Sequence, residues 1–295
     1  MKKHLPTIIL IFVFLIGLCL LLYPSVSDYW NSFHQTKAIA AYSEAVADLG
    51  EAKREKLWAD AQAYNVQLAK EPAHFELSEG ERSEYESLLD VDGSGIIGYI
   101  EIPSIRCFLP IYHGTDEGVL QVAVGHIEGT SLPVGGESTH CVLSGHRGLP
   151  SAKLFTNLDQ LQEGDVFMLN VLDETLTYEV DQILIVEPED VSPLRIEEGK
   201  DYCTLVTCTP YGINTHRLLV RGHRIPNLAN TIAAAAEAIQ IEPVLVAPMI
   251  AAPVLMILLI VLMVRTMRKR NNEKENMEPC SIDTETQRRD SYKTE

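Results

Sequence analysis

Basic residues and cysteines are scarce in this sequence, and each shortage argues against a class of protein. The chain of 295 residues has 24 Lys and Arg against 41 Asp and Glu, a formal net charge of −17. Nucleic-acid binding needs clustered basic side chains that neutralise phosphates, so this balance argues against a DNA or RNA partner. Of the six cysteines, Cys19 and Cys280 lie near the two ends of the chain, and the other four belong to a segment too long to need disulfide staples, so they do not indicate a disulfide-stapled secreted domain. They show no Cys-x-x-Cys spacing, so they do not indicate a metal site either.

Long apolar runs are missing from the middle of the chain and occur only near its two ends. The first run lies between Lys3 and Asp28, and the second covers residues 243–264. Each has the ~20 residues that a helix needs to cross a ~30 Å hydrocarbon core. The alternative for the first run is a cleaved signal peptide, but large residues follow it where a small-x-small cleavage site would lie. We therefore predict an uncleaved N-terminal anchor over residues 1–27 and a second transmembrane helix over 243–264.

The charges that flank the two runs predict their orientation in the cell membrane. Lys2 and Lys3 precede the first run, and four basic residues follow the second: Arg265, Arg268, Lys269 and Arg270. The positive-inside rule then places both termini in the cytoplasm and residues 28–242 outside the cell. This outer part has 14 Lys and Arg against 34 Asp and Glu, a net charge of −20. We expect residues 227–242 to form a stalk and residues 265–295 a disordered cytoplasmic tail.

Residues 28–94 are predicted to form a helical segment ahead of the main domain. Apolar residues recur there at the spacing of one helix face: Tyr42, Val46, Leu49, Leu57, Ala61, Tyr64 and Leu68. The Glu-Pro pair at 71–72 ends this pattern, because proline cannot continue the helical hydrogen bonds. Ser78 followed by Glu81 is the pattern of a capping box and predicts a second, short helix that ends near Leu89.

Residues 95–226 carry short β-rich segments separated by turn residues. Eight such segments follow one another: GIIGYIEIP, CFLPIYH, LQVAVGH, THCVLSGH, DVFMLNVLD, TLTYEVDQILIVEP, YCTLVTC and HRLLVRGHRI. Regular short strands without long intervening helices favour a barrel or a sandwich over an α/β sheet. We expect one helical insert at residues 154–161.

A cysteine at a strand end is the most informative feature of this region. In TLVTCTPYGINTHRLLVRG, Cys208 ends a strand, a turn follows, and the returning strand carries Arg217. A nucleophilic thiol needs a nearby base or cation, and this hairpin brings a guanidinium back toward the sulfur. The alternative is that Cys208 is a small buried apolar residue, as free cysteines often are. Cys107, Cys141 and Cys203 are interpreted in that way.

Two further patterns allow more than one interpretation. His146 ends an apolar strand in SGHRG, but His113 and His126 have similar contexts, and spacing cannot show which of them meets Cys208.

The stretch from Asp90 to Glu101 matches the calcium loop of an EF-hand. An EF-hand needs a helix after its loop, whereas the sequence here predicts a strand, so we favour a tight turn over a calcium site.

Taken together, these motifs resemble the sortases. TLVTC followed nine residues later by Arg217, with a histidine in an earlier SGHRG, is the pattern of that family. The strings GYIEIP, LPIYHGT, GHIEGTSLPVGG and SGHRGLPSAKLF resemble class C, the pilin-polymerising branch. The match covers residues 95–225. It implies a mainly β fold, a closed eight-stranded barrel with an N-terminal helical segment, flanked by two transmembrane helices.

The resemblance also implies an activity and three catalytic residues. Cys208 would attack the Thr–Gly carbonyl of an LPxTG-like sorting signal, and Arg217 would stabilise the carbonyl oxygen as charge develops. His146 would protonate the leaving amine and then deprotonate the incoming one. That incoming amine would be a lysine of another pilin subunit. No cofactor and no metal is predicted.

Further contacts follow from the same resemblance. We predict substrate contacts at residues within these motifs: Thr207, Gly145, Thr130 and Ser131. Class C members often carry a lid with an Asp-Pro-aromatic triplet, and the corresponding stretch here is near 71–77, with Glu71, Pro72 and Phe75. His216 precedes Arg217 on the same strand, so its side chain should face away from the site.

Three alternatives to a pilin polymerase stay open at this stage. A housekeeping-type sortase would pass proteins to a cell-wall precursor amine, and a cysteine peptidase would release them to water. The third alternative is a catalytically idle scaffold that keeps the barrel. Such a scaffold is expected to have lost at least one of Cys208, His146 and Arg217, and all three are present.

Overall fold

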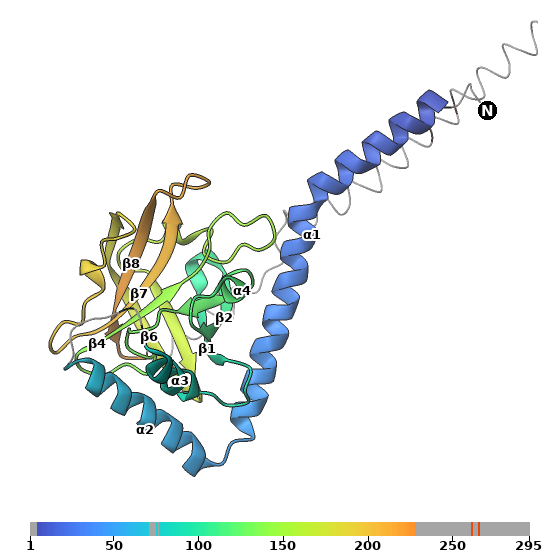
Figure 1. Ribbon diagram of the computed structural model, residues 1–295. Helices are drawn as coiled ribbons and strands as arrows, with labels where there is room; N and C mark the ends of the chain where they lie inside the picture. The colour runs from blue at the N-terminus through green and yellow to red at the C-terminus, as the bar shows by residue number, and fades with distance from the viewer. Residues whose placement is uncertain (1–4, 71–74, 76, 228–260, 262–264, 266–295) are drawn as a thin grey trace, which may run out of the picture. The chain divides into compact units, whose positions relative to one another are not determined.

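A closed β-barrel is the main body of the protein (Figure 1). The computed structural model describes residues 5–70, 75, 77–227, 261 and 265. The barrel order is β1-β2-β3-β4-β7-β8-β6-β5, which confirms the predicted eight-stranded barrel. Each strand corresponds to one predicted segment: β1 Ile96–Ile102, β2 Cys107–His113, β3 Val124–His126, β4 Thr139–Ser144, β5 Val166–Val171, β6 Glu174–Val186, β7 Asp201–Thr209 and β8 His216–Ile225.

Two of the strand pairs are parallel, and one of them positions the site. β2 pairs with β3, and β4 with β7, in parallel, whereas the other neighbours are antiparallel. The parallel pairing of β4 and β7 brings the ends of both strands to the same edge of the barrel. Alternate side chains fill the interior, where Phe167 stacks on Tyr178 with ring centroids 5.5 Å apart.

The N-terminal helix α1, Leu5–Ala47, is much longer than the predicted anchor. Its last turns pack on the barrel through buried side chains, among them Ile39, Tyr42 and Val46. Its first part exposes apolar side chains. Among the described helices, α1 is the one that is long and apolar enough to cross a membrane. The predicted second span at 243–264, the stalk at 227–242 and the tail at 265–295 lie outside the described residues, apart from residues 227, 261 and 265.

Two more helices follow α1, and the sequence does not predict the break between α1 and α2. The apolar spacing predicts one continuous helix face from Tyr42 to Leu68, but α1 ends at Ala47 and α2 covers Glu51–Leu68. Gly50 adopts an extended conformation before α2, and glycine is a poor helix former in an interior position. The helix α3, Glu79–Ser87, begins with the predicted capping box of Ser78 and Glu81.

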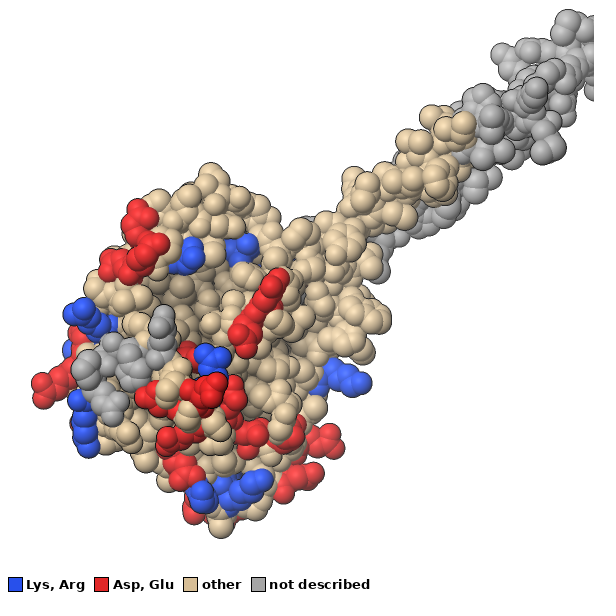
Figure 2. Space-filling view, in the orientation of Figure 1, with Lys and Arg blue, Asp and Glu red and all other residues tan. Residues whose placement is uncertain are grey.

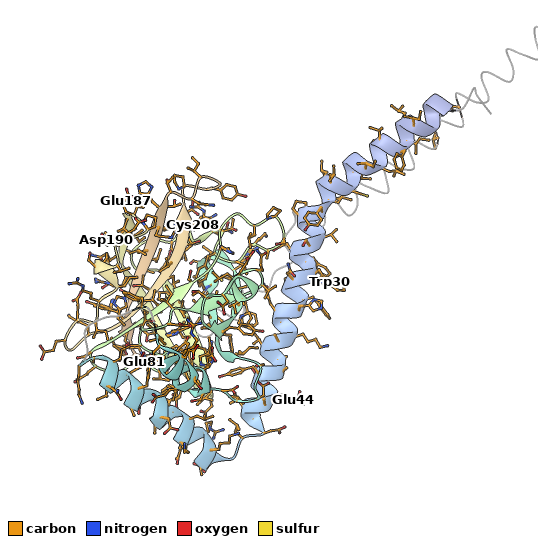
Figure 3. The ribbon with its side chains drawn as sticks, in the orientation of Figure 1. Trp30, Glu44, Glu81, Glu187, Asp190 and Cys208 are labelled. Atoms are coloured by element: carbon orange, nitrogen blue, oxygen red, sulfur yellow. The ribbon has the colours of Figure 1, made fainter. Side chains whose placement is uncertain are left out.

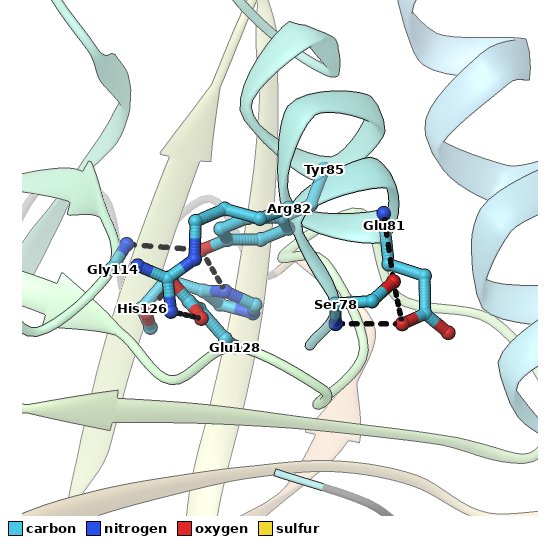
Figure 4. Close-up of polar contacts among 7 residues, drawn as sticks. All are labelled: Ser78, Glu81, Arg82, Tyr85, Gly114, His126 and Glu128. Atoms are coloured by element: carbon cyan, nitrogen blue, oxygen red, sulfur yellow. Dashed lines mark hydrogen bonds and ion pairs between the residues drawn. The ribbon is translucent and has the colours of Figure 1, made fainter. Parts of the chain in front are cut away.

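Polar contacts hold α3 against the barrel (Figure 4). The Tyr85 hydroxyl lies 2.8 Å from His126 Nδ1, and it accepts a hydrogen bond from the Gly114 amide at 3.1 Å. Arg82 forms an ion pair with Glu128 at 2.9 Å. Burial raises the pKa of Tyr85, so its hydroxyl stays protonated and can donate to the imidazole. The predicted second helix is therefore part of the barrel's packing rather than a separate module.

Two further predictions are tested by local structure. The helical insert expected at 154–161 is wrong: the segment consists of turns and a 3₁₀ turn at Leu158–Gln160, and Leu154 has a positive φ of 39° that no α-helix accommodates. The tight Asp/Gly turn is confirmed at residues 90–95, where Asp90 and Asp92 accept hydrogen bonds from the amides of residues 93 and 94. The strand β1 follows it where an EF-hand would have a helix, and Glu101 accepts a hydrogen bond from Asn170 at 3.1 Å.

The remaining short elements lie in the connections between strands. They are η1 Pro103–Ile105, α4 Glu117–Leu120 and η3 Ser192–Leu194. None of them was predicted from the sequence.

Candidate functional site

Cys208 and Arg217 are directly opposite each other on neighbouring strands. They are Cα partners in the antiparallel ladder of β7 and β8, so their side chains lie on the same face of the sheet. Both are half-buried, and Cys208 lies near the end of β7 (Figure 3). The Arg217 guanidinium donates to the backbone oxygens of Asn214 and His216, at 3.4 and 3.2 Å. Among the described residues no carboxylate pairs with Arg217, so its charge remains available to a ligand.

His146 lies just beyond the end of β4, at the same edge of the barrel. The parallel register pairs Ser144 with Val206, and the Gly145 amide donates to the Val206 oxygen at 3.0 Å. The Thr207 hydroxyl donates to the Gly145 oxygen at 2.7 Å. Continuing this register by two residues brings His146 level with Cys208. The structure thus gathers the three predicted catalytic residues at the ends of β4 and β7 and the start of β8.

A second arginine, which no sequence pattern indicates, joins the two loops of this site. Arg147 forms an ion pair with Asp159 and donates to the Thr209 hydroxyl at 3.3 Å. Its guanidinium also lies 5.9 Å from the ring centroid of Tyr211, in the β7–β8 turn. Since Arg147 follows His146 and Thr209 follows Cys208, this side chain links the histidine loop to the end of the cysteine strand. Only the fold could reveal this role, because its partners are distant in sequence.

The outer face of the barrel carries a small apolar cluster on the Cys208 side. Val142, Val206 and Leu219 are buried there, apart from the main core, and four half-buried residues pack on them: Ile127, Leu184, Val186 and Leu194. Along β7, Val206 is two residues from Cys208, so both side chains lie on the same face. The sequence could not separate this cluster from the interior, because both faces of β7 are apolar.

The connection between β6 and β7 covers part of this apolar cluster and is held by a buried histidine. His140 Nδ1 donates to the Arg195 backbone oxygen at 2.9 Å, and Nε2 lies 2.7 Å from the Thr204 hydroxyl. Burial lowers the pKa of His140, which favours the neutral ring that can accept from that hydroxyl. Leu194, next to Arg195, is thereby kept on the cluster.

The residues predicted to contact substrate are mostly engaged in protein hydrogen bonds. Thr207 and Gly145 lie beside the catalytic candidates and bond to each other. Thr130 and Ser131 are buried between β3 and β4: the Thr130 hydroxyl donates to the Ile127 oxygen at 2.7 Å, and the Ser131 hydroxyl accepts from the His140 amide at 3.0 Å. The substrate roles of all four residues stay predictions.

The structure also describes most of the other residues that the sequence singles out. Cys107, Cys141 and Cys203 are buried, as predicted, and burial raises the pKa of Cys107 to about 12. His216 lies 3.2 Å from Glu187, and neighbouring positions on a strand face opposite ways. Of the predicted lid, Glu71 and Pro72 lie outside the described residues; Phe75 is described and half-buried.

The described residues offer no group of three or more His, Cys, Asp or Glu side chains that could hold a metal ion. His113 and His126, whose strand-end contexts resemble that of His146, both lie against Tyr85 of α3 instead. A half-exposed thiol, an arginine across the ladder and a histidine at the same barrel edge define a candidate cysteine-enzyme site on a β-barrel.

Comparison with known proteins identifies the family. The family described as "Sortase domain" matches residues 100–225. Sortase C1 from Streptococcus agalactiae is 53% identical, with a TM-score of 0.64, and the match covers 65% of this chain and 100% of that chain. Sortase C from Clostridium perfringens, solved with the C-terminal cell wall sorting motif, is 45% identical with a TM-score of 0.58, covering 65% of this chain and 100% of that one.

A curated relative gives the same result over a shorter region. Sortase D of Bacillus subtilis (strain 168) is 34% identical over 131 residues, or 43% of this chain and 63% of the relative, so the match spans less than two thirds of that protein. The chain belongs to the sortase family of cysteine transpeptidases, and its likeness to the sortase C structures assigns it to class C.

Proposed function

We propose that this protein is a membrane-bound transpeptidase that cleaves an LPxTG-like sorting signal and joins pilin subunits. The observation that carries the proposal is the pairing of Cys208 with Arg217 across β7 and β8, at the edge where β4 delivers His146. The half-buried Cys208 thiol is accessible from outside, unlike the fully enclosed thiols of Cys141 and Cys203. A nucleophile beside a cation is what acyl transfer requires.

The three side chains then have distinct roles. The Cys208 thiolate attacks the Thr–Gly carbonyl, and the C–N bond breaks as a thioester forms. Arg217 stabilises the oxyanion, and its planar fork of donors suits that oxygen better than a lysine ammonium does. His146 gives its proton to the leaving glycine amine and takes one from the incoming amine. The apolar cluster around Val206 offers a surface for the apolar side chains of the sorting signal.

The partners and location in this proposal follow from the family and the chain's organisation. The donor is a pilin or another surface protein with an LPxTG-like signal, and the acceptor is a lysine amine of a second subunit. The protein lies in the cell membrane of a Gram-positive cell, with its catalytic domain outside. The apolar first part of α1 supports the N-terminal anchor.

The test uses the full chain in lipid vesicles, a peptide carrying an LPxTG sequence and a lysine-bearing pilin peptide. Mass spectrometry of the products should find an isopeptide bond to lysine. Release to water only would favour a peptidase, and transfer only to a cell-wall amine would favour a housekeeping enzyme.

Substitutions at the paired residues test the mechanism. Cys208→Ala should abolish both thioester and product, and Arg217→Lys should lower kcat/KM by about 100-fold, because oxyanion stabilisation is lost. The matched controls are Cys107→Ala, which removes a buried thiol, and Arg224→Lys at the far end of β8. Both controls should keep their activity. Product from the Cys208→Ala chain would contradict the proposal.

A further inference from the structure

The loop that carries His146 has no regular hydrogen-bond ladder of its own. The His146 loop, residues 145–157, connects the end of β4 to the 3₁₀ turn at Leu158. Inside the barrel, the Phe155 amide donates to the His146 oxygen at 3.1 Å, and the Phe155 ring packs on Gly145. A loop without a ladder depends on tertiary contacts for its order, so contacts on its outer side act together with those of Arg147 in setting where His146 lies.

The outer side of the His146 loop is held by the N-terminal helix. Asn31 Nδ2 donates to the Ser151 backbone oxygen at 2.8 Å, and Asp28 Oδ1 accepts from the Lys153 amide at 2.8 Å. A second Asp28 oxygen lies 3.9 Å from the Lys153 ammonium. These contacts join segments more than a hundred residues apart. They satisfy backbone groups of the loop that regular structure would otherwise satisfy.

The same turns of α1 mark the boundary of the apolar anchor. Asp28 is the first acidic residue after the apolar run. One helix face carries Asp28, Asn31 and Gln35, and this face turns toward the barrel. On the outward face, Trp30 is 64% exposed and Phe33 is 58% exposed; Figure 3 shows Trp30 on the side away from the barrel. Exposed aromatic side chains beside an apolar span are typical of a membrane–water interface.

We propose that Asp28 and Asn31 are positioning residues for His146, through which the membrane-anchor helix holds the catalytic histidine loop in place. The inference rests on the proposed function, because it takes His146 as the acid–base group. The contacts run from α1 to residues 151 and 153 of the loop, and from Phe155 back to the His146 backbone. Anchoring and catalysis are therefore coupled: α1 both tethers the barrel and supports the loop that carries His146.

The experiment compares variants of the full chain in lipid vesicles. Asp28→Ala and Asn31→Ala each remove one contact to the loop, whereas Asp28→Asn keeps an oxygen that can accept from the Lys153 amide. Gln35→Ala is the matched control, because Gln35 lies on the same helix face and donates to the backbone oxygen of Val122, outside the His146 loop, at 2.7 Å. All four forms are measured by amide hydrogen exchange and by turnover of the LPxTG peptide.

The proposal predicts faster exchange in residues 145–157 for Asp28→Ala and Asn31→Ala. It also predicts that kcat falls about tenfold while KM stays within about twofold, since misplacing a proton-transfer group slows chemistry more than binding. In Asp28→Asn, the exchange of residues 145–157 and kcat should both stay close to their wild-type values. Gln35→Ala should change neither the exchange of these residues nor kcat.

Two outcomes would overturn the positioning role. One is unchanged exchange and kcat in Asp28→Ala and Asn31→Ala, and the other is an equal effect from Gln35→Ala, which would indicate general undocking of α1. If the wild-type chain itself fails to turn over the peptide, the proposed function is wrong, and the exchange data still decide whether α1 holds the loop.

Discussion

Gly145 is a single residue on which the geometry of the site depends. A Cβ added there would lie 2.7 Å from the Phe155 ring, closer than any stable contact, and Phe155 is fully buried. We expect Gly145→Ala to lower the free energy of unfolding by about 1–3 kcal/mol, because the ring or the strand end must move. Activity should fall with it, since His146 is the next residue.

Urea unfolding and peptide turnover of the full chain measure the two effects of this substitution. Gly80→Ala is the control, because Gly80 lies in α3 with open space where the new Cβ would stand. This variant should be slightly more stable than the wild type, since alanine favours a helix more than glycine does. A Gly145→Ala protein as stable and as active as the wild type would contradict the assigned close packing.

His113 is a residue whose titration should affect stability. Burial, together with the nearby His126, lowers the pKa of His113 from 6.5 to about 4. Between those two pH values the unfolded chain binds a proton that the folded chain does not, so the free energy of unfolding falls as the pH is lowered through this window. The loss is at most about 3.5 kcal/mol, at ~1.4 kcal/mol for each pKa unit.

The free energy of unfolding, measured at several pH values for the wild type and for His113→Gln, tests this pH dependence. The wild-type protein should lose more stability than the variant between pH 6.5 and 4. Asp201 and Glu101, whose pKa values burial raises, act in the opposite direction, but they are common to both proteins and cancel in the difference. Parallel curves for the two proteins would show that His113 does not titrate as described.

At the scale of elements, the buried Tyr85 hydroxyl joins α3 to the barrel. Tyr85→Phe would leave His126 Nδ1 and the Gly114 amide without their partner, so we expect a loss of about 1–3 kcal/mol in the free energy of unfolding. Tyr99→Phe is the matched control, since the Tyr99 hydroxyl makes no hydrogen bond to any described residue. Hydrogen exchange in α3 should rise only in the first variant; equal exchange in both would disprove this role for Tyr85.

At the scale of the whole molecule, acidic side chains gather on one part of the surface. Figure 2 shows acidic side chains gathered over the part of the surface around α2 and α3, and α3 alone carries Glu79, Glu81, Glu84 and Glu86. If this surface steers lysine-bearing partners, raising salt from 0.05 to ~0.5 M should slow encounter with a basic pilin subunit, because screening shortens the range of the field. Stopped-flow association rates measure this. A rate independent of salt would limit the acidity to a role in solubility.

Local patterns alone were sufficient for several parts of this protein. The β segments follow from short apolar runs between turn residues, and the capping box at Ser78 predicted the start of α3. The placement of Cys208 opposite Arg217 was also predictable, because a single turn joins the two strands and a hairpin folds back on itself. These features depend on interactions between residues close together in the chain.

Other features required the folded chain, because they depend on contacts between distant segments. Only the parallel pairing of β4 with β7 brings His146 rather than His113 or His126 level with Cys208, and no local spacing encodes a pairing of strands about 60 residues apart. The burial of Ser131 is likewise a tertiary outcome. The sequence by itself determined the family, the strands and the candidate nucleophile. Tertiary structure decided which histidine lies level with Cys208 and that α1 contacts that histidine's loop, because only folding makes those backbone groups neighbours.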